Sequence, residues 1–394
     1  MGSYRSERMG LLPPYLFVEI DRRKSEAIEA GRDIIDLGVG DPDQPTPSFI
    51  IEAMASAIRD PANHTYALGI GKRGFREAVC GFFQRRYGVE IDTNREILAL
   101  LGSKEGIGHL PTAVVNPGDV VLVPSPGYPV YTSGTIFAGG TTHVMPLCED
   151  HGWLPVFEDI PADVCRKARL MFLNYPNNPT AACADLEFFE RAVSFARKHD
   201  ILIAQDAAYG ELYYEKPPPS ILQVEGARDV AIELHSFSKT FNMTGWRVGF
   251  AVGNADAIAA LAAVKSNLDS GVFGAVQSAA IEAITHTDHV AVRAMIDLYR
   301  QRRDVIVDGL RAAGWSVPSP AATFYVWARC PSGNDSMATA ARILDEVGVV
   351  VIPGVGFGET GEGYVRLALT VDIERSREVV RRIASISFKP AEAG

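Results

Sequence analysis

The stretch VAIELHSFSKTFNMTGWRVGFAVG, residues 230–253, decides the fold and also points to the chemistry. It begins with a mostly apolar run, VAIELH, which predicts a buried strand. A single lysine, Lys239, follows among small hydroxyl residues, and Arg247 comes eight positions later, before a second apolar run. A lysine in this setting is partly withdrawn from water, and burial lowers the pKa of its amine. A neutral amine can attack a carbonyl and form a Schiff base.

Short apolar runs alternate with helical patterns through the middle of the chain, such as the pattern at 185–198. This alternation predicts an α/β fold whose mostly parallel sheet is covered by helices on both faces. In such sheets, ligands bind beyond the carboxyl ends of the strands, so the residues after each run are candidates for a site. The expected strands lie within residues 96–102, 119–124, 169–176, 201–206, 230–238 and 246–253.

The pattern changes after about residue 280, where longer helices and mixed strands predict an α+β lobe. The segment DIIDLGV (33–39) needs a partner sheet, so we expect the start of the chain to join this lobe. Helices are expected at 285–312, 336–347 and 372–386. The predicted domains are an N-terminal arm with part of the small domain (1–45), a large cofactor-binding domain (46–280) and a small C-terminal domain (281–394).

The bulk composition excludes several classes of protein. Hydrophobic residues make up 47% and charged residues 22%, which is typical of a soluble globular protein. The net charge of −10 argues against a broad nucleic-acid interface, although a few arginines in a cleft can still attract an anion. No run is long enough to cross a membrane, and the start of the chain has no signal-peptide pattern. The histidines show no metal-ligand spacing, and the scattered cysteines favour a reducing, cytoplasmic compartment.

Polar residues follow several of the expected strands. Asp206 closes the run ILIAQD, and a partly desolvated carboxylate there needs a cationic partner. Tyr209 adds a phenol three residues later, and Asn178 adds an amide after another strand. Taken singly, Asp206 is also compatible with a helix N-cap, Tyr209 with a core aromatic residue, and the Asn-Pro pair with a turn.

Other polar residues favour phosphate binding. Ser103 and Lys104 open a helix whose backbone N–H groups can hold an anion. Ser236, Ser238 and Arg247 add donors suited to a phosphate. Pyridoxal phosphate needs a Schiff-base lysine, an acid at its ring nitrogen and a phosphate site, and would use all of these groups.

Over nearly its whole length, the sequence resembles the class I/II aminotransferases of the fold-type-I pyridoxal-phosphate enzymes. The resemblance implies a large domain with a mostly parallel seven-stranded sheet between helices, and a smaller α+β domain built from both chain ends. The motifs that carry it, in family order, are VGDPDQPTP (39–47), NHTYALGIGKRGFREAV (63–79), GSKEGI (102–107), PSPGYPVY (124–131), NYPNNPT (174–180), DAAYGELYY (206–214), SFSKTFNMTGWRVG (236–249) and YVRLALT (364–370).

The resemblance implies the roles of the catalytic residues. Lys239 would bind the cofactor aldehyde and then serve as the base at the substrate Cα. Asp206 would keep the ring nitrogen protonated, so that the ring accepts electrons. Tyr209 and Asn178 would bind the phenolic oxygen of the ring, and Tyr128 would stack on the ring face.

The remaining implied roles concern the phosphate, the substrate and the partner subunit. Ser103, the Lys104 backbone, Ser236, Ser238 and Arg247 would hold the phosphate. Tyr66 would reach the phosphate of a neighbouring subunit, which implies a homodimer with shared active sites. Arg366 would clamp the substrate α-carboxylate in a bidentate manner, assisted by the Gly40 backbone and by Asn178.

The start of the chain, LLPPYLFVEIDRRKSEAI (11–28), together with GSKEG and KSNLDSG (265–271), is similar to LL-diaminopimelate aminotransferases of the shorter bacterial and archaeal type. This similarity implies transfer of an amino group from LL-2,6-diaminopimelate to 2-oxoglutarate, in lysine biosynthesis. Tyr15 and the Lys104 side chain would then contact substrate. The alternative for Tyr15 is an arm packed on the partner subunit. Two positions depart from the pattern, since Ala181 replaces a glycine and Ser270 replaces an asparagine found in some members.

Other functions remain open at the level of sequence. Related sequences include aspartate, alanine and aromatic aminotransferases, and divergent members run elimination or oxidation. GIGKRG (69–74) matches a dinucleotide-binding pattern, although no clear strand precedes it. A sensor that binds pyridoxal phosphate without turnover is a further alternative, but the chain has no basic DNA-binding stretch.

Overall fold

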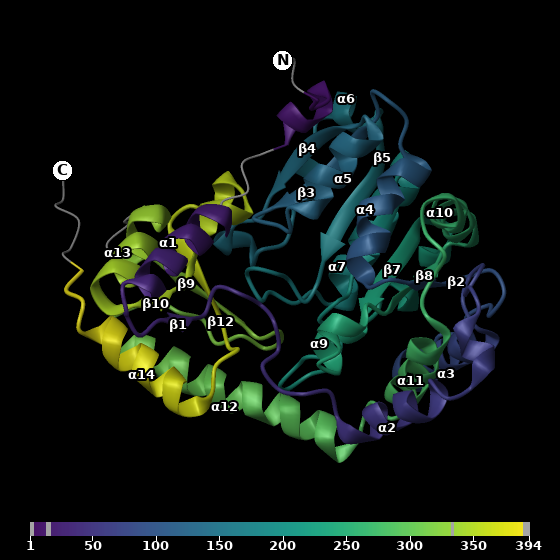
Figure 1. Cartoon of the computed structure of the whole chain (residues 1–394). Coiled ribbons are helices and arrows are strands. Elements are labelled where there is room, and N and C mark those ends of the chain that lie inside the picture. Colours follow the sequence, from purple (N-terminus) through teal and green to yellow (C-terminus); the bar gives the residue numbers. More distant parts are fainter. Residues whose placement is uncertain (1–3, 13–16, 332–334, 389–394) are drawn as a thin grey trace.

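A seven-stranded sheet forms the centre of the larger part of the molecule in the computed structural model, which describes residues 4–12, 17–331 and 335–388 (Figure 1). The strand order is β2-β8-β7-β6-β5-β3-β4. Only β8 runs antiparallel to its neighbours β2 and β7, and the other pairs are parallel. The strands are β2 (Ile97–Leu100), β3 (Val120–Ser125), β4 (Thr141–Pro146), β5 (Ala168–Asn174), β6 (Leu202–Asp206), β7 (Ala231–Ser236) and β8 (Gly249–Gly253).

The predicted α/β class and all six strands expected from the sequence are confirmed. The seventh strand, β4, was not among those six. It lies at the edge of the sheet and reads TTHVMP, with most of its residues exposed or partly exposed. An edge strand needs no continuous apolar run, so the pattern that identified the buried strands does not mark it.

Helices cover both faces of this sheet because alternate side chains of each strand point to opposite faces. Leu98 and Leu100 pack toward one core, and Ile97 and Ala99 pack toward the other. The first core lies under α4 (Ser103–Val114), α5 (Val130–Ala138) and α10 (Ala255–Leu268). The second lies under α3 (Arg73–Tyr87), α7 (Leu186–His199) and α11 (Gly274–Thr285).

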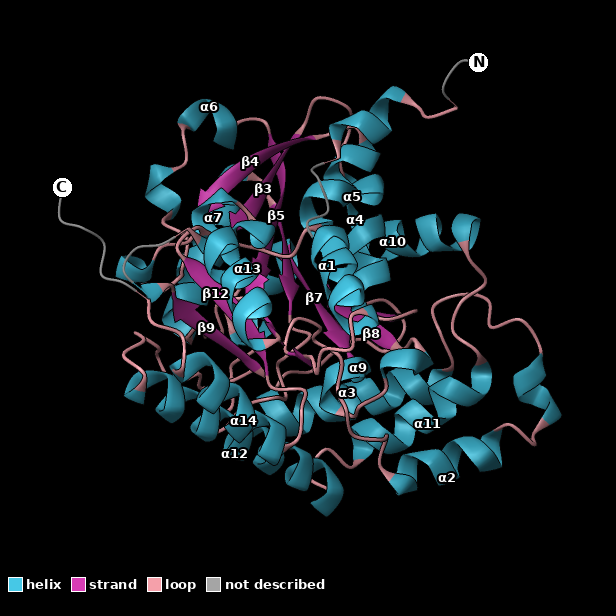
Figure 2. Ribbon diagram, turned by 60° about the vertical axis from the view of Figure 1, so that its left-hand side comes forward, coloured by secondary structure: helices cyan, strands magenta, loops and turns pink. Residues whose placement is uncertain are grey.

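A separate core joins residues from both ends of the chain. The strand expected at 33–39 forms as β1 (Ile35–Asp36) and pairs in parallel with β10 (Val349–Val350), so the start of the chain joins the C-terminal part of the fold. A three-stranded antiparallel sheet lies nearby, with β12 (Tyr364–Ala368) between β9 (Tyr325–Arg329) and β11 (Ile352–Pro353). The helices of this part are α12 (Val290–Ala312), α13 (Ser336–Val347) and α14 (Ile373–Ala384), and α12 packs along α14 (Figure 2). The domain limits after residues 45 and 280 stay a prediction.

The helix expected at 285–312 is interrupted at its start. The chain leaves α11 at Thr285 and makes a turn, and α12 begins at Val290, where the His289 side chain accepts a hydrogen bond from the Ala291 backbone N–H. The remaining helices are α1 (Phe17–Glu29), α2 (Ser48–Ala57), α6 (Ala162–Cys165), α8 (Ala227–Val230) and α9 (Phe237–Thr240). Over the described ranges, none of the helices combines the length and the apolar character needed to cross a bilayer.

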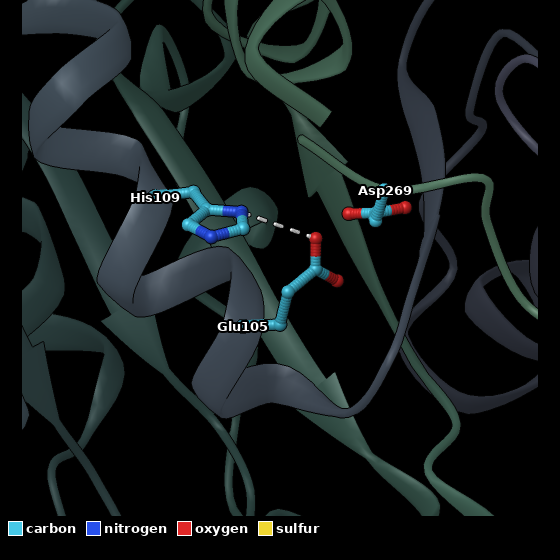
Figure 3. Close-up of side chains that lie close together, drawn as sticks. All are labelled: Glu105, His109 and Asp269. Carbon is cyan, nitrogen blue, oxygen red and sulfur yellow. Dashed lines mark ion pairs between the residues drawn. The ribbon is translucent and has the colours of Figure 1, made fainter. Parts of the chain in front are cut away.

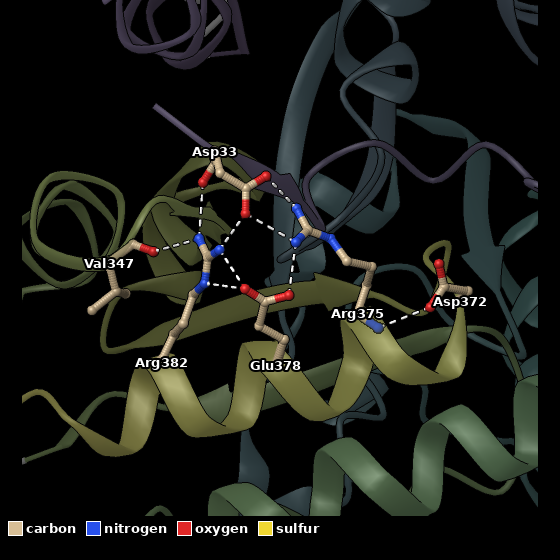
Figure 4. A network of polar contacts seen from close by, with 6 residues as sticks. All are labelled: Asp33, Val347, Asp372, Arg375, Glu378 and Arg382. Carbon is tan, nitrogen blue, oxygen red and sulfur yellow. Dashed lines mark hydrogen bonds and ion pairs between the residues drawn. The ribbon is translucent and has the colours of Figure 1, made fainter. Parts of the chain in front are cut away.

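An ion-pair network fixes the N-terminal segment to the last helix (Figure 4). Asp33, just before β1, accepts hydrogen bonds from Arg375 at 2.6 and 2.9 Å and also from Arg382, both on α14. Glu378 lies between the two arginines and binds both. The bonds from Arg375, and next those from Arg382, lower the pKa of Asp33 to about 2. The network therefore joins residues that lie more than 300 positions apart in sequence.

Candidate active site

The carboxyl ends of β5, β6 and β7 and the N-terminus of α4 open into one cavity of about 500 Å³. Its volume is that of a typical small-molecule site. Twelve residues singled out from the sequence line it, although they come from both parts of the fold. They are Gly40, Ser103, Lys104, Tyr128, Asn178, Asp206, Tyr209, Ser236, Ser238, Lys239, Arg247 and Arg366.

Lys239 lies on α9, the single helical turn that follows β7. Its Nζ donates a hydrogen bond of 2.6 Å to the Gly40 carbonyl oxygen. Burial lowers the pKa of this amine to about 8, and the nearby Arg366 and Arg247 act in the same direction, against the attraction of Asp41. At slightly alkaline pH a large share of the amine is therefore neutral, which is the form that a nucleophile or a base requires.

Asp206 ends β6 and is 4% exposed. Its Oδ2 accepts the Tyr131 O–H at 2.9 Å, and its Oδ1 accepts the Ala208 N–H at 3.1 Å. Burial is the largest influence on this carboxyl and raises its pKa to about 6. No lysine or arginine of the described ranges forms an ion pair with Asp206. A cationic group of a bound ligand would therefore supply the partner that the sequence predicted this carboxylate to need.

Tyr209 is also buried, and its hydroxyl shares a 2.9 Å hydrogen bond with the Tyr325 hydroxyl. Sequence reasoning missed Tyr325, because it lies in an apolar strand and looks like an ordinary core aromatic residue. Its hydroxyl is so close to Gly40 that a Cβ at residue 40 would lie 2.0 Å away. Residue 40 must therefore be glycine for the backbone to pass this wall of the cavity.

Arg366 lies on β12 and is 4% exposed, so it is a buried arginine rather than a surface one. Its Nη1 donates to Asn178 Oδ1 at 2.8 Å, and its Nη2 donates to the Gly38 carbonyl oxygen at 2.7 Å. The guanidinium lies 4.2 Å from the Tyr325 ring centroid, and its buried Nε has no hydrogen-bond partner. Because no carboxylate in the described part of the chain pairs with it, its charge is available to an anionic ligand.

A group of donors surrounds the N-terminus of α4. Ser103 begins this helix, and Ser236, Ser238 and Arg247 line the cavity beside it. Arg247 donates to the Leu101 carbonyl oxygen at 3.1 Å and has a positive φ of 53°. Gly102, the residue before Ser103, has a φ of +82°, a conformation that favours glycine, and a Cβ there would lie 2.6 Å from Arg247 Nη2. Hydroxyls, a guanidinium and a helix N-terminus together form a set of donors that suits a phosphate.

The described residues that lie close enough together to suggest a metal site are Glu105, His109 and Asp269 (Figure 3). The ammonium of Lys265 lies 2.6 Å from Glu105 and 3.1 Å from Asp269. This buried lysine supplies the positive charge that a metal would otherwise bring. The other oxygen of Glu105 accepts the Leu101 N–H at 2.7 Å, so the cluster also fixes the loop before Ser103.

One predicted residue of the described ranges, Tyr66, is not among those that line the cavity. Tyr66 is 81% exposed and borders a separate hollow with Thr65, Leu68 and Lys72. Tyr15 lies outside the described residues. The dinucleotide interpretation of GIGKRG fails on local structure, because residues 65–72 form a loop rather than a strand before α3.

The fold, the residues that line the cavity and the similarity to known sequences together identify the protein as an aminotransferase. The chain belongs to the class I and II aminotransferase family, whose model matches residues 32–383. It is 51% identical to an LL-diaminopimelate aminotransferase of Syntrophobacter fumaroxidans, over 98% of this chain and all of that one. It is likewise 51% identical to one of Aquifex aeolicus, over 97% and 99% of the two chains. Substrate-bound BacF of Bacillus subtilis has a similar structure, with a TM-score of 0.94 and 39% identity over 98% and 99% of the chains.

Proposed function

We propose that this aminotransferase binds pyridoxal phosphate in the cavity and moves an amino group from LL-2,6-diaminopimelate to 2-oxoglutarate. The observation that carries the proposal is the convergence of Lys239, Asp206 and Arg366 on one space of about 500 Å³. These side chains provide an amine of lowered pKa, a buried carboxyl that forms no ion pair with a lysine or arginine of the described ranges, and a buried guanidinium that pairs with none of the carboxylates described there.

The residues present fit the cofactor. The buried Asp206 carboxyl would be stabilised in its ionised form by a protonated ring nitrogen. The donors around the start of α4 would hold the phosphate, and Tyr209 and Asn178 line the same space between these two ends. When bound, pyridoxal phosphate supplies an aldehyde that takes up the amino group and a ring that withdraws electrons from the substrate Cα.

Lys239 would provide the proton transfer. As a neutral amine its Nζ can accept the proton from the substrate Cα, and its pKa of about 8 allows the same group to return a proton. The Gly40 carbonyl, 2.6 Å from Nζ, holds the amine at the floor of the cavity. Because donor and acceptor would use one site in turn, we expect ping-pong kinetics.

Arg366 would bind the α-carboxylate that all amino-acid donors and 2-oxo acid acceptors share. Its bonds to Asn178 and Gly38 fix the plane of the guanidinium, and Arg366 lines the cavity. A charge-assisted bond from the guanidinium to a carboxylate would be stronger than a bond between neutral groups.

Two features support diaminopimelate as the donor. The relatives that are about half identical to this chain carry the name LL-diaminopimelate aminotransferase. The cavity also carries charges of both signs, Lys104 at the start of α4 and Asp21 on α1. The far end of diaminopimelate is a second amino acid, and an ammonium together with a carboxylate would complement it.

A homodimer forms part of the proposal. Tyr66 and Leu68 are 81% and 75% exposed, and Leu268 and Phe273 are exposed as well. Tyr66 and Leu68 border one hollow with Gly274, the residue after Phe273. We propose that a second copy covers this apolar surface; the predicted phosphate contact requires that Tyr66 then lie next to the partner's cavity.

A half-reaction screen tests the substrate. The purified protein, loaded with pyridoxal phosphate, is mixed with single amino acids, and the absorbance of the bound cofactor is followed. LL-diaminopimelate should react faster than aspartate, alanine and phenylalanine. A faster reaction with one of these would reject the proposed donor but leave the cofactor site intact. Lys239→Ala should abolish the reaction and the borohydride-stable cofactor label, and normal turnover by this variant would reject the site itself.

A further inference from the structure

A buried tyrosine that the sequence did not single out lies next to the cavity. Tyr131 is in the first turn of α5 and is 1% exposed. It follows Tyr128 by three residues, and its backbone N–H donates to the Tyr128 carbonyl oxygen at 3.2 Å. Tyr131 does not line the cavity, so it touches ligands only through other residues.

Tyr131 contacts two of the residues that do line the cavity. Its hydroxyl donates to Asp206 Oδ2 at 2.9 Å, from α5 across to the end of β6. Its ring meets the Tyr128 ring edge to face, with centroids 6.0 Å apart. On its other side it stacks on Phe172, with centroids 4.8 Å apart and planes at 20°. The ring is therefore held in place independently of its hydroxyl.

We propose that Tyr131 is a positioning residue that orients Asp206 and favours its ionised form, while its ring sets the position of Tyr128. This inference rests on the proposed function, in which Asp206 meets the edge of the cofactor ring and Tyr128 its face. One side chain would then fix the geometry of both contacts. An aspartate in a buried site needs such support, because each unsatisfied lone pair of a carboxylate costs free energy.

The charges around Asp206 agree with this role. The titratable groups that face it are Tyr131, Tyr209 and His235. Burial, and then the carboxylate itself, raises the pKa of Tyr131 well above its ordinary value, so Tyr131 stays a neutral donor. Its hydrogen bond lowers the pKa of Asp206, against the larger effect of burial. The Ala208 N–H acts in the same direction on the other oxygen.

The test is Tyr131→Phe, which removes the hydroxyl and keeps the ring on Phe172. The readout is the infrared difference titration of the buried carboxyl in the cofactor-free protein, with Asp206→Asn to identify the band. Loss of a hydrogen bond to a charged acceptor should raise the pKa of Asp206 by about one unit. A shift of one pKa unit corresponds to a tenfold change in an equilibrium constant, so the dissociation constant for pyridoxal phosphate should rise about tenfold in Tyr131→Phe.

Tyr175→Phe is the matched control. Tyr175 is 3% exposed, and its hydroxyl donates to the Trp153 carbonyl oxygen at 2.8 Å, away from the cavity lining. Tyr175→Phe should lower the free energy of unfolding by an amount similar to that for Tyr131→Phe and leave the titration of Asp206 unchanged. An unshifted titration in Tyr131→Phe, or an equal shift in Tyr175→Phe, would overturn the inference. If Tyr131→Phe does not fold, Tyr131 is a stability residue and the inference is equally rejected. The carboxyl titration uses no substrate, so its result is independent of which donor the enzyme takes.

Discussion

The role assigned to Arg366 leads to a quantitative prediction for Arg366→Lys. Lysine keeps the positive charge but loses the planar fork, which now binds Asn178 and Gly38 and would bind the substrate α-carboxylate. A single ammonium can replace one of the two bonds to the carboxylate. A hydrogen bond to a charged group is worth about 1.5–3 kcal/mol, so kcat/KM should fall about 10- to 150-fold.

The pattern of the effect matters as much as its size. The α-carboxylate is bound equally in the ground state and the transition state, so KM should rise while kcat changes little. Every amino donor and 2-oxo acid carries this group, and the rise should be similar for all of them. Steady-state kinetics with two donors and two acceptors provide the measurement.

Arg303→Lys is the matched control, because Arg303 is also a buried arginine. It binds Glu215 and the Pro320 carbonyl oxygen and does not line the cavity. It should lower stability without raising KM. An unchanged KM in Arg366→Lys, or a rise for one substrate alone, would refute the assignment and move the carboxylate site elsewhere.

Three further predictions concern stability. The pKa of Asp206 in the folded state is about 6, above its ordinary 3.8, so the folded state binds more protons than the unfolded state. As the pH rises from about 4 to 6, the free energy of unfolding of the cofactor-free protein should therefore fall by on the order of 3 kcal/mol relative to Asp206→Asn. Urea unfolding at several pH values measures this, and an equal dependence on pH in the two proteins would contradict it. Lys265→Met leaves Glu105 buried without its partner and should lower the free energy of unfolding by about 3 kcal/mol. Adding Glu105→Gln to this variant should restore part of the loss. If Lys265→Met alone leaves the stability unchanged, the buried pair does not stabilise the fold. Ala181 has a φ of +60°, which strains the backbone of any residue except glycine. Ala181→Gly should therefore raise the free energy of unfolding by about 0.5–1 kcal/mol in the same assay. A loss of stability would show that the methyl group of the alanine contributes more than the backbone strain costs.

The sequence could predict most of the cavity because of how parallel sheets are built. Lys239, Asp206 and Asn178 each follow a buried apolar run, and the carboxyl ends of parallel strands meet at one edge. Their positions at the ends of predicted strands are therefore enough to predict that these residues lie close together. The family resemblance added Arg366, which lies on another sheet and carries no such local signal.

Tyr131 and Tyr325 could not be predicted, because no local feature of the sequence marks them as residues near the cavity. Each lies among apolar residues in a regular element, where the local pattern is typical of core packing. Their functional atoms are hydroxyls, and the partners of these hydroxyls are 75 and 116 positions away in sequence. Only a structure shows that Tyr131 reaches Asp206 rather than a backbone carbonyl.

The balance of charge inside the cavity explains how an acidic protein can act on acidic substrates. The whole chain carries a net charge of −10, yet the described residues that line the cavity include three cationic side chains, Lys104, Arg247 and Arg366, beside the amine of Lys239. The carboxylates of the described lining are Asp21, Asp41 and Asp206; Asp21 pairs with Lys24, and burial raises the pKa of Asp206 to about 6. A substrate carboxylate and a phosphate would therefore meet Arg366 and Arg247 at short range, where screening by salt is weak. The arrangement of charges inside the cavity, rather than the net charge of the chain, would select small anions.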